Sequence, residues 1–472
     1  MLVPTIGIEV HVELKSKSKV FSSSLNDFHS EANSNVNVID LGYPGVLPKL
    51  NKKVVDMAMM AALALNCKIN KEMHFDRKNY FYPDLPKGYQ ITQSKTPIGY
   101  EGYVEIEVDG KKKKIGIERI HIEEDTCKSL HTSDGTLLNF NRAGVPLVEI
   151  VSKPDIENEK EAMAYLETLR EILLYLKISD VKIEEGSMRC DANVSLKEKD
   201  SEKLGTKTEI KNIGSISNVG TSILYEIDRQ KEIIASGGLI REETRRFDDK
   251  TNTTVLMRVK ETGNDYRYFP EPDLPYIHIS DEWINKTRDN MPVLPNVLRE
   301  KYSSLGINEN NIKTIIANTE LSEFLESIID KVNPIIATNL LTGDILSYLN
   351  KNNLSLLNIK LNEENFSELI KMLEDKKISS KQSKDIIPIL INDGGSVSKI
   401  ISSLGIEQIN DESLLLGIVT KVIGDNPESV DDYKAGKDRA VKYLMGQIMK
   451  ESKGQANPQN VNKMLIEELK KL

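Results

Sequence analysis

The sequence predicts an α+β protein with a strand-rich first part, a helical middle part and a small helical C-terminal part. Its 472 residues exceed what one hydrophobic core organises, so two to four domains are expected. Up to about residue 290, polar and apolar residues alternate between Gly and Pro, whereas later segments follow the 3.6-residue helical period. Met291-Pro-Val-Leu-Pro295 contains two prolines that interrupt regular structure there. We therefore predict domains over 1–290, 291–407 and 408–472.

Helices in the first part are predicted where apolar residues recur at helical spacing: 53–66, 159–176 and 221–235. Gly237-Gly238 would end the third. In the middle part, helical runs cover 311–329 and 362–374, and Asp393-Gly-Gly-Ser396 marks a turn. Elsewhere the first part is expected to form strands and loops, with Lys111 to Lys114 at a hairpin tip after Asp109-Gly110.

The sequence of the C-terminal part predicts a helix-turn-helix. Lys453-Gly454 would end one helix, and Asn457 would cap the next, with Pro458 at its first position. Two apolar stripes share this helical spacing: Ala440, Tyr443, Leu444 and Ile448, then Val461, Leu465 and Leu469. We predict a compact appendage over 408–472.

Composition excludes several classes of protein. A net charge of −9 argues against a generic basic DNA coat, although a local basic groove remains open. Cys67, Cys127 and Cys190 lie far apart without a Cys-x-x-Cys motif, so neither a disulfide framework nor a cysteine zinc site is expected. The start lacks the pattern of a signal peptide, and the longest apolar stretch is too short to span a membrane. A cytoplasmic protein without a membrane segment is expected.

Four segments alternate so that charged side chains share one strand face. The sets are Glu9, His11 and Glu13; Arg119, His121 and Glu123; Arg189, Asp191 and Asn193; and Lys207, Glu209 and Lys211. Taken alone, each is as consistent with a solvated face or loop as with a site. Two sets concentrate acids with His and two concentrate cations with Asp or Glu, and this coincidence favours a site. Such a face can hold a divalent metal and phosphate, as phosphoryl transfer requires.

The absence of several sequence motifs limits the nucleotide-binding schemes and reactions to be considered. The sequence has no P-loop, no dinucleotide-binding glycine motif and no His-Glu-x-x-His, so a nucleotide would bind by another scheme. No Cys or Ser stands in a nucleophile motif, which argues against amide hydrolysis by this chain. Segments 75–89 and 265–273 interleave aromatic with basic residues. This pattern fits stacking on unpaired bases, or equally a proline-pinned loop whose rings pack on the sheet.

Seven motifs in this order closely resemble the B-subunit family of the tRNA-dependent amidotransferases, over essentially the whole chain. They are Gly7-Ile-Glu-Val-His-Val-Glu-Leu14, Asp76-Arg-Lys-Asn-Tyr-Phe-Tyr-Pro-Asp84, His121-Ile-Glu-Glu-Asp125, Asn141-Arg-Ala-Gly-Val-Pro-Leu-Val-Glu-Ile150, Met188-Arg-Cys-Asp-Ala-Asn193, Tyr266-Arg-Tyr-Phe-Pro-Glu-Pro-Asp273 and Gly454-Gln-Ala-Asn-Pro458. The resemblance implies an N-terminal cradle on a large antiparallel sheet, an all-helical domain and a C-terminal tail domain that reaches for tRNA.

The resemblance also implies the reaction. ATP, with Mg²⁺, would phosphorylate the side-chain carboxylate of mischarged Glu-tRNA(Gln) or Asp-tRNA(Asn), and ammonia would then displace phosphate. Ammonia would come from a partner glutaminase (amidase) subunit through an internal channel, and a small third subunit would brace the pair. By resemblance, the metal ligands would be Glu9, His11 and Glu124, with Glu149 and Asp191 as further ligands or outer-shell groups. Phosphate would contact Arg142, Arg189 and Lys207.

One departure from the family concerns zinc. Many members carry two cysteine pairs near the start that bind zinc, but Phe21-Ser-Ser-Ser24 and Gly42-Tyr-Pro-Gly45 occupy that region here. Structural zinc should be absent, and hydrogen bonds and packing must hold the loop. Two alternatives to the amidotransferase stay open: a non-catalytic tRNA-binding scaffold and a free-standing metal-dependent phosphohydrolase. The sequence does not decide between Glu-tRNA(Gln) and Asp-tRNA(Asn).

Overall fold

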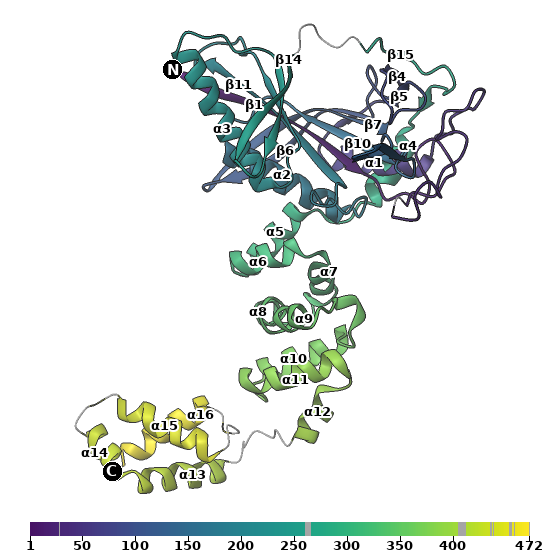
Figure 1. Cartoon of the computed structure of the whole chain (residues 1–472). Coiled ribbons are helices and arrows are strands. Elements are labelled where there is room, and N and C mark those ends of the chain that lie inside the picture. The colour runs from purple at the N-terminus through teal and green to yellow at the C-terminus, as the bar shows by residue number, and fades with distance from the viewer. Residues whose placement is uncertain are drawn as a thin grey trace. The chain divides into compact units, whose positions relative to one another are not determined.

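The structure is a computed structural model that describes residues 1–27, 29–259, 266–404, 412–434, 437, 439–452, 456 and 458–471 (Figure 1). The chain forms two compact units, Met1–Pro295 and Asn296–Leu472, which divide directly after the predicted 291–295 joint. The predicted boundary between 407 and 408 lies outside the described residues. So do Asp265, Lys453, Gly454, Gln455 and Asn457 of the segments and motifs above.

The first unit is built on a large sheet. In the described part of the chain this sheet has nine strands, in the order β14-β13-β12-β11-β1-β10-β7-β6-β2. Their bounds are β14 Thr253–Val259, β13 Glu243–Asp248, β12 Thr208–Lys211, β11 Met188–Glu198, β1 Leu2–Glu13, β10 Pro146–Ser152, β7 Lys111–Glu124, β6 Gly99–Val108 and β2 Lys68–Ile69. Among these strands only the β12–β13 pair is parallel. The predicted α+β class is confirmed, and the large sheet, predicted as antiparallel, is mixed because of this one parallel pair.

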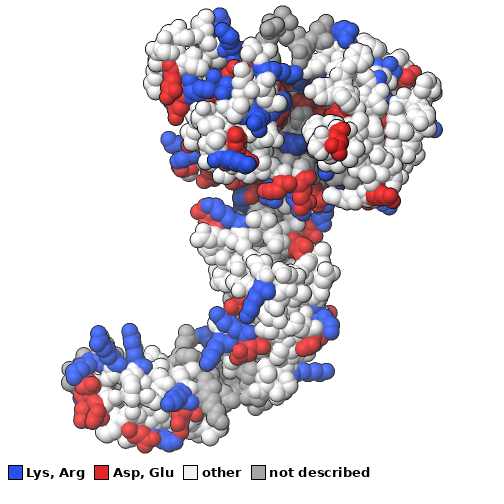
Figure 2. Space-filling model, viewed as in Figure 1, with Lys and Arg blue, Asp and Glu red and all other residues white. Residues whose placement is uncertain are grey.

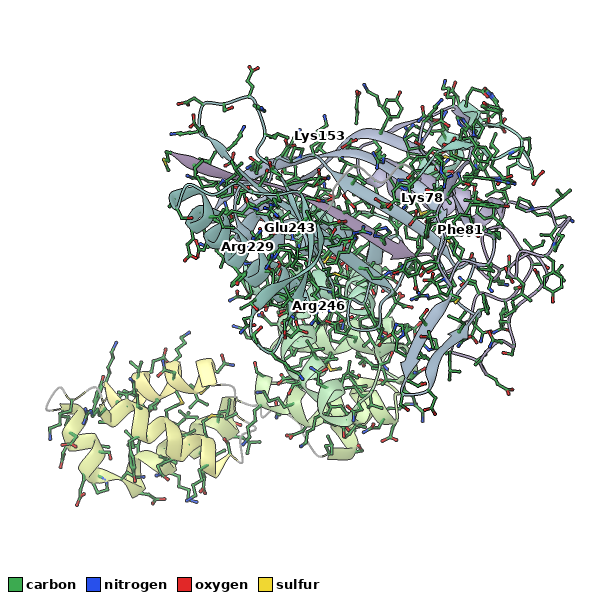
Figure 3. The ribbon with its side chains drawn as sticks, turned by 45° about the horizontal axis from the view of Figure 1, so that its top comes forward. Lys78, Phe81, Lys153, Arg229, Glu243 and Arg246 are labelled. Carbon is green, nitrogen blue, oxygen red and sulfur yellow. The ribbon has the colours of Figure 1, made fainter. Side chains whose placement is uncertain are left out.

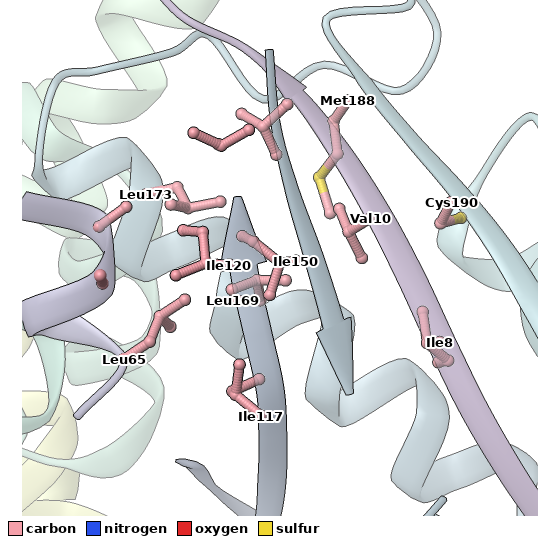
Figure 4. Packing of buried hydrophobic residues seen from close by; sticks show 14 of the residues in the cluster. Ile8, Val10, Leu65, Ile117, Ile120, Ile150, Leu169, Leu173, Met188 and Cys190 are labelled. Carbon is pink, nitrogen blue, oxygen red and sulfur yellow. The ribbon is translucent and has the colours of Figure 1, made fainter. Parts of the chain in front are cut away.

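One face of the sheet carries the hydrophobic core. Helices α1 (Lys52–Ala64), α2 (Glu159–Tyr175) and α3 (Ile216–Ala235) contact its strands. Ile8, Val10 and Ile150 are almost completely buried among core residues from these helices (Figure 4). Each such side chain contributes about 1.5–3 kcal/mol of transfer free energy. Because side chains alternate along a strand, this burial turns Glu9, His11 and Glu149 to the opposite face.

The helix boundaries follow local capping signals. Asn51, Asn158 and Ser215 accept hydrogen bonds from backbone amides in the first turns of α1, α2 and α3. Helix α3 begins five residues before its predicted start at 221, because Ser215 is an efficient N-cap. Gly237 follows its C-terminus with φ +79°, as predicted for a glycine there.

A buried ion network attaches α3 to the far edge of the sheet. Arg229 of α3 lies 2.7 Å from Glu226 and 2.6 Å from Glu243 on β13 (Figure 3). Arg245 lies 3.1 Å from the same Glu243. The side chain of Glu226 is fully buried, so its charge needs these partners. The network fixes the parallel β12–β13 pair and with it the edge strand β14.

The β6–β7 hairpin corrects one detail of the prediction. Asp109 and Gly110 form the turn with φ of +50° and +75°, the two positive values typical of a type I′ turn. Lys111 to Lys114 belong to strand β7 and do not form the hairpin tip. Lys112 and Lys113 pair in register with Glu107 and Ile106 on β6.

Among the described residues, the first unit also contains three smaller sheets. They comprise β15 (Phe269–Pro270), β4 (Asp76–Asn79) and β5 (Tyr89–Thr92); β16 (Ile277–His278) and β3 (Glu72–Met73); and β8 (Lys128–Thr132) and β9 (Gly135–Asn139). Helix α4 (Asp281–Asp289) contacts α1. The two aromatic-basic segments of the sequence therefore pair with each other through β15 and β4.

The second unit is helical, as predicted. Its first helices are α5 (Pro295–Ser304), α6 (Glu309–Ala317), α7 (Thr319–Ile328), α8 (Pro334–Leu340), α9 (Leu346–Asn352), α10 (Glu363–Glu374), α11 (Ser380–Asn392) and α12 (Val397–Leu404), with a π-helical segment at Leu341–Ile345 and a 3-10 turn at Leu356–Asn358. The predicted run 311–329 is two helices, because Asn318 ends α6 and its side chain caps α7. Gly394 and Gly395 have positive φ in the predicted turn after α11.

The C-terminal part has a hydrophobic core of its own, formed by α13 (Glu412–Asp425), α14 (Pro427–Lys434), α15 (Arg439–Glu451) and α16 (Pro458–Leu469). The predicted stripes are buried, with the exception of Tyr443, which is exposed. Among the helices of the described residues, none is both long and apolar enough to cross a membrane.

Candidate functional site

Register across the central strands brings acids and imidazoles into adjacent rows. Glu149 on β10 lies opposite His11 on β1 and opposite His121 on β7. Two residues before His11 on β1, Glu9 lies opposite Asp191 on β11. These side chains all stand on the face that the core does not cover, where a water-accessible site can form.

The first group consists of His11, Glu123 and Glu149. Their ligand atoms all lie within 4.8 Å of one another. Glu149 Oε2 is 3.3 Å from His11 Nε2 and 3.2 Å from His121 Nε2, and Glu123 Oε1 is 3.5 Å from His11 Nε2. The two carboxylates are the donors that suit Mg²⁺ or Mn²⁺, and the imidazole of His11 offers a nitrogen donor beside them.

The electrostatics of this group match the requirements of a cation site. Burial lowers the pKa of His121, but the charges of Glu149 and Glu123 outweigh it and raise that pKa to about 9. Burial also lowers the pKa of His11, but the hydrogen bond to Glu149 and the charge of Glu149 outweigh it and raise that pKa. Burial raises the pKa of Glu149, but the imidazoles of His121 and His11 hold it well below its usual range. The carboxylates are therefore held ionised by neighbouring positive charge, which a divalent cation would also supply.

The second group consists of Glu9, Asp191 and Glu209, whose ligand atoms also lie within 4.8 Å of one another. Lys211 contacts Asp191, and its Nζ is 2.9 Å from Glu209 Oε1. Burial, followed by the charges of Glu149, Asp191 and Glu209, raises the pKa of Glu9. This group is already neutralised in part by an ammonium of the protein.

Both groups line one cavity of ≈ 440 Å³. The side chains that border it include five cations, Lys78, Arg119, Lys207, Lys211 and Arg258, and two rings, Tyr266 and Tyr268. Figure 2 shows charged side chains of both signs around a hollow of the first unit. Acids that can hold a metal and cations that can contact phosphate thus share one water-accessible space.

Lys78 reaches the cavity from strand β4. Its Nζ lies 4.9 Å from the centre of the Tyr266 ring and 5.8 Å from that of Tyr80. Burial opposes the charge of Lys78, but Glu123 and Tyr268 outweigh it and raise the pKa. Phe81, in the loop after β4, is 84% exposed (labelled in Figure 3). Some rings of the aromatic-basic segments therefore act as anchors, whereas Phe81 is available for contacts.

The structure brings together most of the predicted site residues. Glu9, His11, Glu149, Asp191 and Lys207 all line the cavity. Glu124 lies outside both acidic groups, because its neighbour Glu123 takes the cavity-facing position of β7. Glu124 instead contacts Lys87 and accepts a 2.9 Å hydrogen bond from the Ile91 amide.

Two of the predicted phosphate contacts are engaged elsewhere. Arg189 lies 2.9 Å from Asp125, and Arg142 lies 3.5 Å from the same carboxylate. Arg142 also donates to the Thr126 and Cys127 carbonyls at 3.0 Å. Neither arginine lines the cavity. Of the three, only Lys207 is placed to meet a ligand there.

Comparisons with known proteins agree with this geometry. A family model described as "GatB/GatE catalytic domain" matches residues 4–285, and one described as "GatB domain" matches residues 323–469. The chain belongs to the amidotransferase B-subunit family. The first match spans all residues that line the cavity, from Glu9 to Tyr268.

Three relatives are, by name, B subunits of aspartyl/glutamyl-tRNA(Asn/Gln) amidotransferase. Those from Geobacillus thermodenitrificans and Geobacillus kaustophilus are 53% identical, and the one from Enterococcus faecalis is 51% identical. Each match covers 99% of this chain and 98% of the relative. The likeness therefore extends through both units.

Several residues that line the cavity were not among the metal ligands and phosphate contacts predicted from the sequence. Glu123, Glu209 and Lys211 stood on the predicted charged faces, and strand alternation alone distinguishes Glu123 from Glu124. Lys78, Tyr266 and Tyr268 belong to the aromatic-basic segments, whose position beside the sheet face depends on tertiary pairing. In this member of the B-subunit family, strand alternation is thus the sequence signal that identifies the acidic residues of the cavity.

Proposed function

We propose that this chain uses ATP to phosphorylate the side-chain carboxylate of Glu-tRNA(Gln) or Asp-tRNA(Asn), after which ammonia replaces the phosphate. The observation that carries the proposal is one cavity holding His11, Glu123 and Glu149 beside Lys78 and Lys207. The names of the relatives supply the substrates, since they specify aspartyl- and glutamyl-tRNA.

The chemistry explains why ATP is needed. A carboxylate has no usable leaving group, so its oxygen first attacks the terminal phosphorus of ATP and ADP leaves. Ammonia then attacks the acyl carbon of the mixed anhydride, phosphate leaves, and the side chain becomes an amide. Phosphoryl transfer depends mainly on positioning and charge neutralisation. The cavity offers both through fixed cations on rigid strands.

We assign each group a task. His11, Glu123 and Glu149 would hold Mg²⁺, which when bound would neutralise charge on the transferring phosphoryl group. Glu9 and Asp191, predicted as further ligands, lie in the adjacent group and border the same space. Lys207 and Lys78 would contact phosphate or carboxylate oxygens. The aromatic rings Tyr266 and Tyr268 would enclose the reacting end of the substrate and exclude water.

The proposal includes partners. Ammonia would be supplied by a glutaminase subunit, braced by a small third subunit, because no nucleophile motif for glutamine hydrolysis occurs in this chain. The C-terminal helices α13–α16 would bind the folded part of the tRNA, and Lys and Arg side chains project from this part in Figure 2.

The test is acyl-phosphate formation in the assembled complex, measured as tRNA-dependent ADP release. His11→Ala and Glu149→Gln should reduce it at least 100-fold, whereas tRNA binding and glutamine hydrolysis persist. Glu105→Gln is the control, since Glu105 is an exposed β6 residue paired with Lys112. Normal ADP release in the two site variants would contradict the proposal and favour a tRNA-binding scaffold. ADP release without tRNA or partner would favour a phosphohydrolase.

A further inference from the structure

The second acidic group already contains a cation. We propose that the Lys211 ammonium is the resident cation of the Glu9–Asp191–Glu209 group and takes the place that a second divalent cation would otherwise occupy. The inference rests on the proposed function for its role in catalysis, but its geometry and its test are separate.

The placement of Lys211 is specific. Its strand, β12, lies beside β11, so Lys211 and Glu209 project from β12 toward Asp191 on the neighbouring strand. The ammonium contacts Asp191 and lies 2.9 Å from Glu209 Oε1. The side chain is 35% exposed, so most of its stem is covered while its charge faces the acids.

Neighbouring groups hold the carboxylates around this ammonium. Glu209 Oε2 accepts a 2.9 Å hydrogen bond from Thr244 Oγ1 on β13. Glu9 Oε1 accepts a 3.0 Å hydrogen bond from Asn193 Nδ2 on β11. The group and the residues that hold it thus come from four adjacent strands, β1, β11, β12 and β13, and the Lys211 ammonium contacts two of the three acids.

The first acidic group differs in the partners it has. In the described chain, the ion pairs of Glu149 are made by the imidazoles of His11 and His121. An imidazole that releases its proton to a binding metal ion offers that metal a lone pair, whereas an ammonium has three donors and no acceptor. The first group can therefore coordinate a metal, and Lys211 prevents the second from doing so.

A fixed cation suits a cavity that must accept anions. Six carboxylates line it, those of Glu9, Glu123, Glu149, Asp191, Glu209 and Glu242. Both ATP and the substrate carboxylate add negative charge to the same space. An ammonium held by Asp191 and Glu209 offsets part of that repulsion independently of the dissolved metal concentration. Lys211 is in this sense a positioning residue.

The test counts Mn²⁺ ions bound per full-length chain, by titration with detection of free Mn²⁺ by electron paramagnetic resonance. Lys211→Gln should bind one Mn²⁺ more than the wild type. Lys207→Gln, which removes a positive charge from the same cavity, should bind the wild-type number. Lys211→Arg should also bind the wild-type number, because a cation is restored.

Further variants secure the interpretation. Lys211→Met keeps the length of the stem and replaces Lys211→Gln if that variant does not fold. Adding Asp191→Asn to either variant should abolish the extra ion. An unchanged count in folded Lys211→Gln and Lys211→Met would overturn the inference. A wild type that binds no Mn²⁺, with one ion in Lys211→Gln, would support the inference while contradicting the metal site of the proposed function.

Discussion

Lys19 and Asp40 form an ion pair with almost no exposure to solvent. Lys19 Nζ lies 3.3 Å from Asp40 Oδ2, and the side chains are 0% and 2% exposed. The Ser22 and Ser24 hydroxyls donate to the same carboxylate at 2.6 and 2.5 Å, and the Asn37 amide donates at 3.0 Å. These bonds hold the segment around Phe21-Ser-Ser-Ser24, which was predicted to be held by hydrogen bonds and packing.

We expect Asp40→Ala to destabilise the first unit by about 3–5 kcal/mol, because it leaves the Lys19 ammonium buried without its partner. The measurement is urea unfolding of the full chain followed by the fluorescence of Trp283, the only tryptophan, which lies in α4 of that unit. Asp180→Ala is the matched control, since the Lys15–Asp180 pair is half exposed and its loss should cost under about 1 kcal/mol. Equal shifts for both variants would contradict the role given to burial.

Removal of zinc should have no effect on this region. Asp40 is saturated by Lys19, Ser22 and Ser24, and the loop contains no cysteine. Elemental analysis of tag-free protein is expected to find no stoichiometric zinc, and a zinc-selective chelator should leave the Trp283 unfolding midpoint unchanged. One tightly bound zinc per chain would show that another set of ligands exists.

The adjacent residues Glu123 and Glu124 offer a sharp comparison. Glu123→Gln should weaken Mn²⁺ binding at least about tenfold, because it removes a carboxylate of the first acidic group. Glu124→Gln should leave Mn²⁺ affinity within about twofold, since that carboxylate contacts Lys87 and the Ile91 amide instead. Isothermal titration of the full chain distinguishes the two. A larger effect at Glu124 would restore the ligand set implied by the family resemblance.

This pair also shows how far the sequence alone reaches. Period-two alternation places Arg119, His121 and Glu123 on one face correctly, but a ligand set transferred by resemblance selected Glu124. Alternation says which face a side chain takes and nothing about which strand lies beside it. The position of Glu149 between His11 and His121 depends on strand order and register, which are set by tertiary packing.

The same limit applies to the rest of the fold. Apolar periodicity located α1 and α2 to within two residues, because their caps and buried stripes are local signals. The break at Asn318 was missed, since one asparagine both ends a helix and caps the next. The parallel β12–β13 pair depends on the crossover through α3 and has no local signature.

Glu368 gives a pH-dependent prediction in the helical unit. Its carboxylate accepts hydrogen bonds from the Val397 and Ser398 amides, at 2.8 and 3.1 Å, and so caps α12. Burial raises the pKa of Glu368, but these bonds and the Ser398 hydroxyl outweigh it and hold the pKa below the ordinary 4.5. A lowered folded pKa means that the stabilisation is complete above 4.5 and is lost as the pH falls through the folded value.

Glu368→Gln should therefore speed hydrogen exchange at the start of α12 by about fivefold at pH 7, or about 1 kcal/mol. The difference from the wild type should shrink as the pH falls below 4.5. Exchange is compared at equal pH, so its intrinsic pH dependence cancels. Glu363→Gln is the control, because Glu363 is an exposed residue of α10. A difference that grows toward acid would reverse the assigned sign.

The last prediction concerns the tail. Helices α13–α16 bury Leu444, Val461 and Leu465 in a separate core, so deleting residues from 408 onward leaves the core of the first unit intact. The cavity lies wholly in that first unit. Deletion should therefore reduce tRNA affinity and amidation strongly, while partner assembly and tRNA-independent glutamine hydrolysis persist. Unchanged tRNA affinity would contradict the proposal that the tail binds tRNA. Loss of assembly would mean that the tail instead supports the structure of the complex.

Point variants separate charge from structure in the tail. Five basic residues were predicted as tRNA backbone contacts: Lys437, Arg439, Lys442, Lys450 and Lys453. Lys453 lies outside the described residues, and Lys437 is 2.7 Å from Asp432, whereas Lys442 and Lys450 are exposed on α15. If each of these two neutralises one phosphate, Lys442→Gln and Lys450→Gln should each reduce the slope of log affinity against log salt by about 0.7–0.9. Lys421→Gln is the control, because Lys421 is held by Glu451. A weakened affinity with an unchanged salt slope would mean that these lysines support the fold of the tail and do not contact the tRNA backbone.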